Sequence, residues 1–166
     1  TAADVGMKVD TLHFHVGSGY LGDALEVLDR VLERVGPMLD AHPEIRTLNV
    51  GGGLGLRLTA SDAAINLGRW ARTVARHTVR RGLKVQVEPG DYLVKDAGVL
   101  LVRVNTVEEK AGTRFVGVDA GLGIQNLPAH YQTPLIVAPL ERRAGATTER
   151  VTIAGNINEA IDLLAE

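Results

Sequence analysis

The sequence predicts an α/β fold in which parallel strands alternate with helices, followed by a mainly antiparallel β module. Two observations lead to this prediction. In the first half, each short apolar run is closed by a glycine-rich turn and followed by a stretch with helical periodicity. Beyond about residue 95, short apolar runs follow one another without a long helix between them. The domain boundary is expected near residues 92–97, which gives domains at 1–94 and 95–166.

The first half contains three expected strands and two expected helices. The strands are predicted over residues 11–16, 47–50 and 83–87, and the first helix over residues 22–41, ending before Pro43. The second helix is predicted to begin at Ser61 or Asp62 as its N-cap and to end at Gly82. Strands joined by helices of this length pair in parallel through right-handed crossovers. Both a barrel and a doubly wound sheet satisfy this pattern.

The second half is predicted to hold four short strands, over residues 99–104, 113–118, 135–137 and 150–154. Residues 159–166 have the pattern of the first turns of a helix that is cut off. Together with the missing initiator methionine, this pattern indicates a piece of a longer protein.

The composition excludes several classes of function. The 18 basic and 20 acidic residues give a net charge of −2, so nothing in the charge favours a nucleic-acid or anionic-membrane partner. No cysteine is present, which excludes disulfides, thiolate metal sites and a thiol nucleophile. No apolar run is long enough for a membrane-spanning helix and no signal peptide is recognised, so a cytoplasmic location is expected.

A glycine cluster follows the second predicted strand, where parallel α/β folds bind their ligands. Glycines at 51, 52, 53 and 55 let backbone N–H groups approach an anion without obstruction by Cβ atoms. The dinucleotide fingerprint fails because residue 56 is leucine, and the P-loop fails because no Gly-Lys-Ser/Thr follows. A phosphate monoester is therefore the candidate ligand, with a tight turn that binds nothing as the alternative.

Two histidines and a serine accompany the first predicted strand. His13 and His15 share one face of this strand because their spacing is two residues. His15, nearer the carboxyl end, is expected to stack on an aromatic cofactor or to polarise a substrate, whereas His13 is interpreted as a core histidine. A zinc site is not favoured because no third ligand lies nearby. Ser18 is expected to donate to a phosphate oxygen or to serve the turn.

Glu88 ends the third predicted strand and is followed by Pro89. A carboxylate at the end of a buried strand is costly unless a cation pairs with it. The candidate partner is a protonated ring nitrogen, and the alternative is a salt bridge to an arginine elsewhere in the fold.

Four segments in this order resemble one family: His-Val-Gly-Ser (15–18), Asn-Val-Gly-Gly-Gly-Leu-Gly (49–55), Val-Glu-Pro-Gly (87–90) and Val-Asp-Ala-Gly (118–121). From about residue 11 to 166, the chain resembles the fold-type III pyridoxal-phosphate enzymes of the ornithine/diaminopimelate decarboxylase group. The resemblance implies the later strands and helices of a TIM-type (β/α)8 barrel, followed by part of a C-terminal β domain. It also implies pyridoxal 5'-phosphate as cofactor, and a homodimer with active sites at the subunit interface.

The resemblance also implies roles for individual residues. His15 would stack on the pyridine ring as a catalytic residue, and Glu88 would pair with the pyridinium nitrogen. The remaining positions implied in the cofactor site are Ser18, Gly51, Gly52, Gly53, Gly90 and Asp91.

Three positions depart from the family pattern. Asn158 stands where the family has a proton-donating cysteine on a segment that reaches into the partner's active site. Asp91 stands where many members have arginine, and Leu127 replaces the arginine of an Arg-Pro pair. The lost cations disfavour diaminopimelate as substrate and favour a diamino acid or a carrier-linked amino acid. Asp119 and Glu159 are then expected to bind an amine.

The expected function is the pyridoxal-phosphate-dependent decarboxylation of a small amino-acid substrate by the full-length protein. The family's cofactor-binding lysine and its last catalytic tyrosine fall outside this chain, so the chain alone is expected to be inactive. Two alternatives remain open: an amino-acid racemase or epimerase on the same fold, and a non-catalytic homologue that binds the cofactor.

Overall fold

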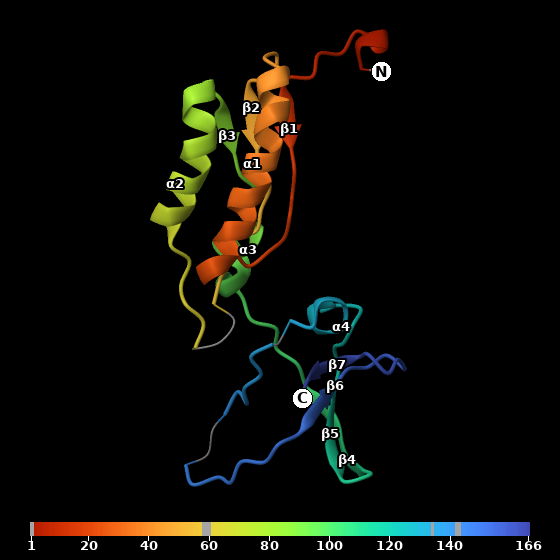
Figure 1. The fold of residues 1–166 in the computed structure, drawn as a ribbon. Helices are drawn as coiled ribbons and strands as arrows, with labels where there is room; N and C mark the ends of the chain where they lie inside the picture. The colour runs from red at the N-terminus through yellow and green to blue at the C-terminus, as the bar shows by residue number, and fades with distance from the viewer. Residues whose placement is uncertain (1, 58–60, 134, 142–143) are drawn as a thin grey trace. The chain divides into compact units, whose positions relative to one another are not determined.

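The computed structural model describes residues 2–57, 61–133, 135–141 and 144–166. The chain divides into two compact units, with the boundary between Gly98 and Val99. Residues 1–98 form unit 1 and residues 99–166 form unit 2. Both units are drawn in Figure 1. Among the described helices, none has the length and apolar character needed to cross a membrane.

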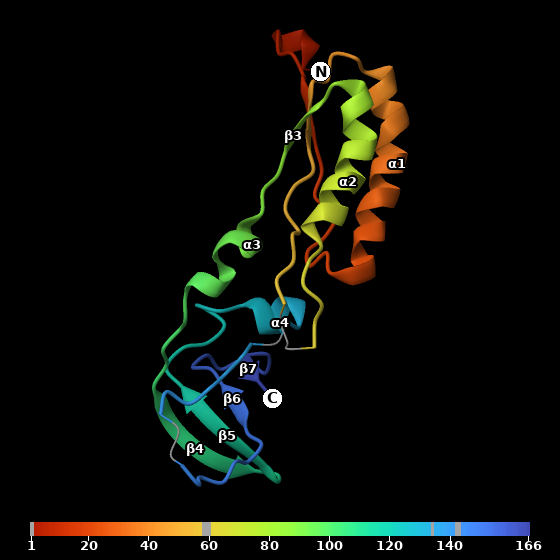
Figure 2. The same ribbon diagram turned by 90° about the vertical axis from the view of Figure 1, so that its left-hand side faces the viewer.

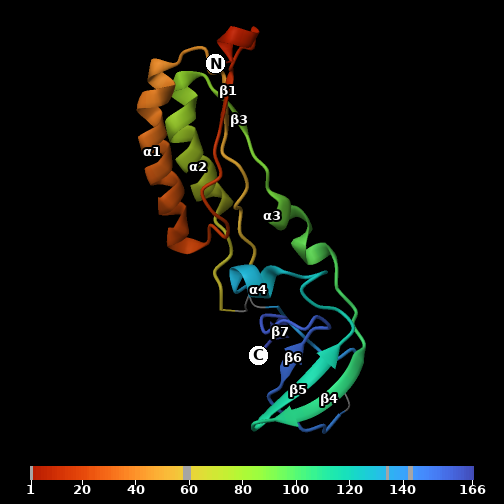
Figure 3. The same ribbon diagram turned by 90° about the vertical axis from the view of Figure 1, so that its right-hand side faces the viewer.

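Unit 1 contains a parallel sheet of three strands in sequence order: β1 (Thr11–His13), β2 (Thr47–Asn49) and β3 (Lys84–Gln86). Helix α1 (Leu25–Ala41) connects β1 to β2, and helix α2 (Leu67–Thr78) connects β2 to β3. Both helices lie on the same side of the strands (Figures 2 and 3). This confirms the predicted parallel α/β arrangement, and adjacent strands in sequence order are what a barrel segment shows.

Several shorter elements complete the chain. Helix α3 (Gly90–Val94) follows β3, and short 3-10 helices cover Ala3–Val5, Gly22–Ala24, Val79–Arg81 and Lys95–Ala97. The predicted N-cap of α2 is wrong: Asn66 caps the helix, and its side chain accepts a hydrogen bond from the Arg69 N–H at 2.8 Å. Gly82 ends the helical region with a φ of +65°, as predicted.

The register of the sheet separates an apolar face from a polar face. Leu48 in the central strand has no exposed surface and belongs to the core that α1 covers. Since side chains alternate along a strand, Asn49 faces the other way. It pairs in register with His13 on β1 and Gln86 on β3. The face turned away from the helices therefore carries a row of polar side chains.

An ion-pair cluster joins the two helices and gives unit 1 a pH-dependent contribution to stability. Asp29 on α1 bonds to Arg76 on α2, and the His77 Nε2 lies 2.8 Å from its Oδ1. These hydrogen bonds, that from Arg76 first, hold the Asp29 pKa below its ordinary value.

We expect Asp29→Asn to lower the free energy of unfolding by about 1 kcal/mol near neutral pH. This is the contribution of a charge-assisted hydrogen bond, reduced because the Asp29 side chain is partly exposed. Because the pKa is depressed in the folded state, the stabilisation is present above the unfolded pKa of about 4 and disappears as the pH falls below it. Urea unfolding of wild type and variant across pH 3–7 measures this difference. A difference that is the same at every pH contradicts the assignment.

Unit 2 is built on a mixed sheet in the order β4 (Val104–Lys110), β5 (Thr113–Val118), β6 (Thr152–Ala154) and β7 (Leu163–Ala165). The β4–β5 and β6–β7 pairs are antiparallel and the β5–β6 pair is parallel. Helix α4 (Leu127–Tyr131), which the sequence did not predict, packs beside β7. The expected mainly antiparallel module is therefore a mixed sheet with one parallel pair among its described strands.

Three predictions in unit 2 are wrong. Residues 99–103 and 135–137 are not strands, and the first regular residue after the boundary is Val104. Residues 159–166 form a turn and β7 instead of a helix. The reason is that Asp162 is buried and its carboxylate accepts hydrogen bonds from backbone N–H groups of other loops, while β7 pairs with β6. The strand predicted at 113–118 is confirmed.

Candidate active site

The loops that follow β1, β2 and β3 pack backbone against backbone, and glycines make this contact possible. A Cβ atom on Gly51 would lie 2.6 Å from the Phe14 carbonyl oxygen, and one on Gly52 would lie 2.6 Å from the Glu88 carbonyl oxygen. A Cβ atom on Gly53, in the loop after β2, would overlap the Gly17 carbonyl oxygen and the Tyr20 ring in the loop after β1. Distances below 3 Å are not tolerated between such atoms, so only glycine allows the three loops to meet. The three sequence motifs are therefore brought together at one end of the sheet.

Hydrogen bonds continue the sheet ladder into these loops. The Phe14 N–H donates to the Asn49 carbonyl at 3.1 Å, and the Glu88 N–H donates to the Gly51 carbonyl at 2.8 Å. The Tyr20 N–H donates to the loop carbonyl of Gly53 at 3.0 Å. The predicted apolar runs were longer than the strands because they extend into this laddered region.

Asn49 is the centre of the polar contacts at this end of the sheet. Its Nδ2 donates to Glu88 Oε1 at 2.8 Å, and its Oδ1 accepts from the Gly51 N–H at 2.9 Å. The second Glu88 oxygen, Oε2, lies 3.7 Å from His13 Nε2. The interpretation of His13 as a core residue is wrong, because half of its side chain is exposed beside this carboxylate. Sequence reasoning also missed Asn49, although its two-residue spacing from Gly51 places both on one face.

His15 is oriented by the glycine loop. The Gly52 N–H donates to His15 Nδ1 at 3.3 Å. Because Nδ1 accepts, the imidazole proton is assigned to Nε2. The bond orients the flat ring beside the loop, an arrangement that suits stacking on an aromatic ligand.

Donor groups without acceptors surround the glycine loop. Among the described residues, the backbone N–H groups of Gly53 and Leu54 and the Ser18 hydroxyl donate to no protein atom. Leu54 is buried and Gly53 half-buried, and unpaired buried N–H groups are rare in folded proteins. An anion such as a phosphate oxygen satisfies such donors. The donor set therefore fits a phosphate monoester, and Glu88 supplies a carboxylate for a protonated ring nitrogen.

The two candidates on α3 make different contacts. Asp91 Oδ2 lies 3.4 Å from Lys95 Nζ on the same helical stretch, and the Gly90 N–H donates to the Glu88 carbonyl at 2.9 Å. Within the described residues, no contact joins the Asp91 carboxylate to the loops at 51–55 or 15–18. Asp91 thus neutralises the nearby lysine.

Unit 2 holds the other candidates in a second cluster. Asp119, directly after β5, accepts a hydrogen bond from the Arg103 N–H on its Oδ1 at 2.8 Å. Its carbonyl accepts from Asn156 Nδ2 at 3.3 Å. This contact brings the loop that carries Asn158 and Glu159, both exposed, against the end of β5. The structure therefore groups the three residues on neighbouring loops.

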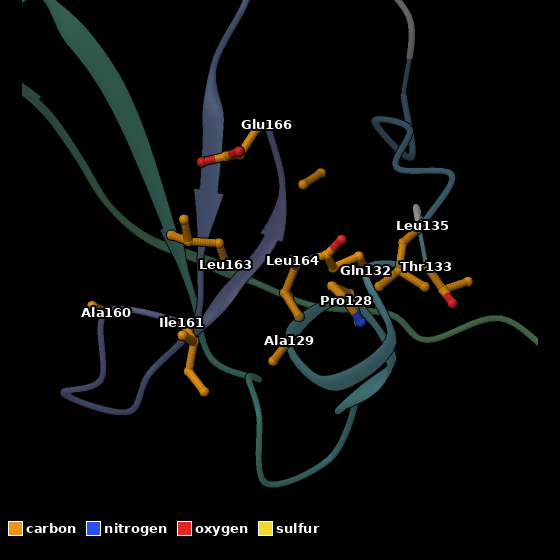
Figure 4. A pocket seen from close by; sticks show the side chains of 11 residues that line it. Pro128, Ala129, Gln132, Thr133, Leu135, Ala160, Ile161, Leu163, Leu164 and Glu166 are labelled. Carbon is orange, nitrogen blue, oxygen red and sulfur yellow. The ribbon is translucent and has the colours of Figure 1, made fainter.

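A pocket of about 540 Å³ lies elsewhere in unit 2, between α4 and β7 (Figure 4). Its lining is mostly apolar and includes Ala160 and Ile161 from the turn after Glu159, as well as Leu164 from β7. None of the candidate residues lines it.

Comparison with known proteins places the chain in a family. The family described as "Pyridoxal-dependent decarboxylase, C-terminal sheet domain" matches residues 19–166. The chain therefore belongs to the pyridoxal-dependent decarboxylases, which are lyases of amino-acid metabolism, and pyridoxal phosphate is the cofactor of this family.

Individual relatives are named diaminopimelate decarboxylases. The enzyme from Methanothermobacter thermautotrophicus is 32% identical over 99% of this chain and 40% of its own length, and that from Bacillus subtilis is 31% identical over 92% and 37%. Among solved structures, the Helicobacter pylori enzyme complexed with L-lysine has the same fold, with a TM-score of 0.81 at 23% identity over 96% of this chain and 40% of that one. The M. jannaschii enzyme with L-lysine gives a TM-score of 0.74 at 26% identity, over 92% and 36%. The chain thus spans about two fifths of the length of these relatives.

Proposed function

We propose that the full-length protein is a pyridoxal-phosphate-dependent decarboxylase that acts on a small amino acid in the cytoplasm. Residues 1–94 then supply the later strands of a (β/α)8 barrel and residues 95–166 part of a C-terminal β domain. The observation that carries this proposal is the meeting of His15, the glycine loop and Glu88 at one end of the parallel sheet.

Each of these residues has a distinct task toward the cofactor. The N–H groups of Gly53 and Leu54 and the Ser18 hydroxyl would hold the phosphate, and the His15 ring would stack on the pyridine ring. The Glu88 carboxylate, oriented by Asn49, keeps a proton on the ring nitrogen. When bound, the cofactor accepts the electrons that remain after the bond from Cα to the carboxylate breaks.

The source of the proton that returns to Cα is different from the family pattern. Asn158 carries an amide, which donates hydrogen bonds but has no acidic proton to release. Water or another acid would have to supply this proton, and Asn158 would contribute only hydrogen bonds at that position.

The polar groups of the second cluster favour a substrate with a cationic or neutral far end. Asp119 and Glu159 are carboxylates and bind an amine. Asp91 pairs with Lys95, and Leu127 places no cation at the start of α4. These features support a diamino acid or a carrier-linked amino acid over diaminopimelate, the substrate named for the relatives.

Spectroscopy and product analysis of the full-length protein test the function. The protein loaded with pyridoxal phosphate is expected to show the absorbance of the lysine-bound cofactor and to release carbon dioxide from lysine or ornithine faster than from diaminopimelate. Loss of optical rotation without carbon dioxide release identifies a racemase or epimerase. Absence of the absorbance band contradicts both enzyme functions and leaves the non-catalytic homologue.

We propose further that the protein is a homodimer with shared active sites. His15, the glycine loop and Glu88 of one subunit form a first cluster, which the second cluster of its partner completes. Mixing equal amounts of Glu88→Gln and Glu159→Gln subunits is expected to restore about a quarter of the wild-type activity. Half of the dimers are mixed, and one of their two sites carries both native residues. Activity that stays at the level of the separate variants contradicts shared sites.

A further inference from the structure

Asp162 is a buried carboxylate to which the proposed function gives no task. Only 3% of its surface is exposed, and it lies directly before β7. Its Oδ1 accepts a hydrogen bond from the Leu122 N–H at 2.5 Å, and its Oδ2 accepts from the Ile157 N–H at 2.7 Å. Its backbone also accepts from the Gly155 N–H at 2.8 Å and donates to the Glu159 carbonyl at 3.0 Å. One residue therefore bonds to both loops of the second cluster.

Two glycines make room for this carboxylate. A Cβ atom on Gly121 or on Gly155 would overlap the Asp162 oxygens. The carboxylate thus fills the space between the loop after β5 and the loop after β6 and leaves no room for another side chain.

A buried carboxylate is unfavourable unless it accepts strong hydrogen bonds, and here both oxygens accept from backbone N–H groups. The two donors, the N–H groups of Leu122 and Ile157, are 35 residues apart in the sequence. The Asp162 carboxylate therefore links two separate loops. One loop follows Asp119, and the other leads directly into Asn158 and Glu159.

We propose that Asp162 is the positioning residue of the second cluster: it fixes Asn158 and Glu159 relative to Asp119, so that these three groups meet the substrate together. This role rests on the proposed function. Asp162 itself does not touch the substrate. Its effect is on the geometry of the groups that do, and displacements of about 1 Å at such groups cost about 100-fold in rate.

The Asp162→Asn variant of the full-length protein tests this role. An asparagine of the same shape has one acceptor and one donor, so either Leu122 or Ile157 loses its hydrogen bond. We expect kcat/KM to fall about 10- to 100-fold. Hydrogen exchange followed by mass spectrometry is expected to be at least about tenfold faster in peptides that contain Leu122 and Ile157.

Leu164→Ala is the matched control, because Leu164 lies two residues further in β7 and its truncation weakens the core of unit 2 without removing a hydrogen bond. At a temperature where both variants are folded, it is expected to leave exchange in these two peptides and kcat/KM close to wild type. If Asp162→Asn does not accumulate as folded protein, Gly155→Ala displaces the same carboxylate from the side of the loop.

The results separate the two proposals. A folded Asp162→Asn or Gly155→Ala variant with unchanged kinetics and unchanged exchange overturns the positioning role. Unchanged kinetics with faster exchange also overturns it, because the loop then has only a structural role. A wild-type protein that releases no carbon dioxide overturns the proposed function, and hydrogen exchange then shows whether Asp162 still fixes the loops, without a catalytic consequence.

Discussion

Replacing Glu88 with glutamine in the full-length protein is expected to lower kcat/KM for decarboxylation by about 10- to 100-fold. A charge-assisted hydrogen bond contributes about 1.5–3 kcal/mol, and the glutamine amide cannot stabilise a protonated ring nitrogen as a carboxylate does. The fold should survive, because glutamine has the same shape and its Oε1 can still accept the hydrogen bond from Asn49 Nδ2, and the backbone bonds of residue 88 do not involve the side chain. The expected change is therefore one of chemistry at the cofactor.

Two measurements make this test specific. The absorbance spectrum of bound pyridoxal phosphate should change in Glu88→Gln, since the protonation of the ring nitrogen changes. Glu44→Gln is a suitable control, because Glu44 is an exposed carboxylate that pairs with His42 at 2.9 Å just after α1. A Glu88→Gln variant with wild-type spectrum and rate would show that the carboxylate has another partner, such as an arginine from elsewhere in the fold.

The regular elements that the sequence predicts well are those fixed by local patterns. The 3.6-residue apolar period and Pro43 predict α1, and its apolar stripe is buried at Leu25, Leu28 and Leu32. The strand at 113–118 combines β-branched and aromatic residues between turns. In contrast, residues 159–166 have a helical pattern, yet long-range contacts of Asp162 and pairing with β6 determine their structure. A pattern within eight residues contains no information about such partners.

The candidate site also combines features that local patterns predict with features that depend on long-range contacts. The order of strand, glycine loop and carboxylate predicts that His15, Gly51 and Glu88 come together, and the structure places them on neighbouring strand ends. The roles of Asn49 and His13 depend on the register of three strands, which sets two polar contacts of Glu88. The relation of Asp162 to Leu122 depends on burial between loops. Neither register nor burial can be read from the spacing of residues in one segment.

Replacing Gly53 with alanine is expected to have the largest effect on the integrity of the first cluster. Gly53 has a φ of +94°, and a Cβ atom there would overlap the Gly17 carbonyl oxygen and the Tyr20 ring. Backbone strain of about 1–3 kcal/mol adds to an overpacking cost of about 1–3 kcal/mol. We expect the melting temperature to fall clearly and the dissociation constant for pyridoxal phosphate to rise at least about tenfold, because the loop at 17–20, which carries Ser18, must move away from the N–H groups of Gly53 and Leu54.

The Gly82→Ala variant separates the effect of backbone strain from the effect of overpacking. Gly82 also has a positive φ, at +65°, but no atom lies within 4 Å of the position of its Cβ. The control variant should therefore show only the backbone strain, about 1–2 kcal/mol, and normal cofactor binding. Equal losses of stability and unchanged cofactor affinity in both variants would mean that the site does not need the contact between the loop after β1 and the loop after β2. A selective loss in Gly53→Ala ties cofactor binding to this backbone contact, which only a residue without a Cβ permits.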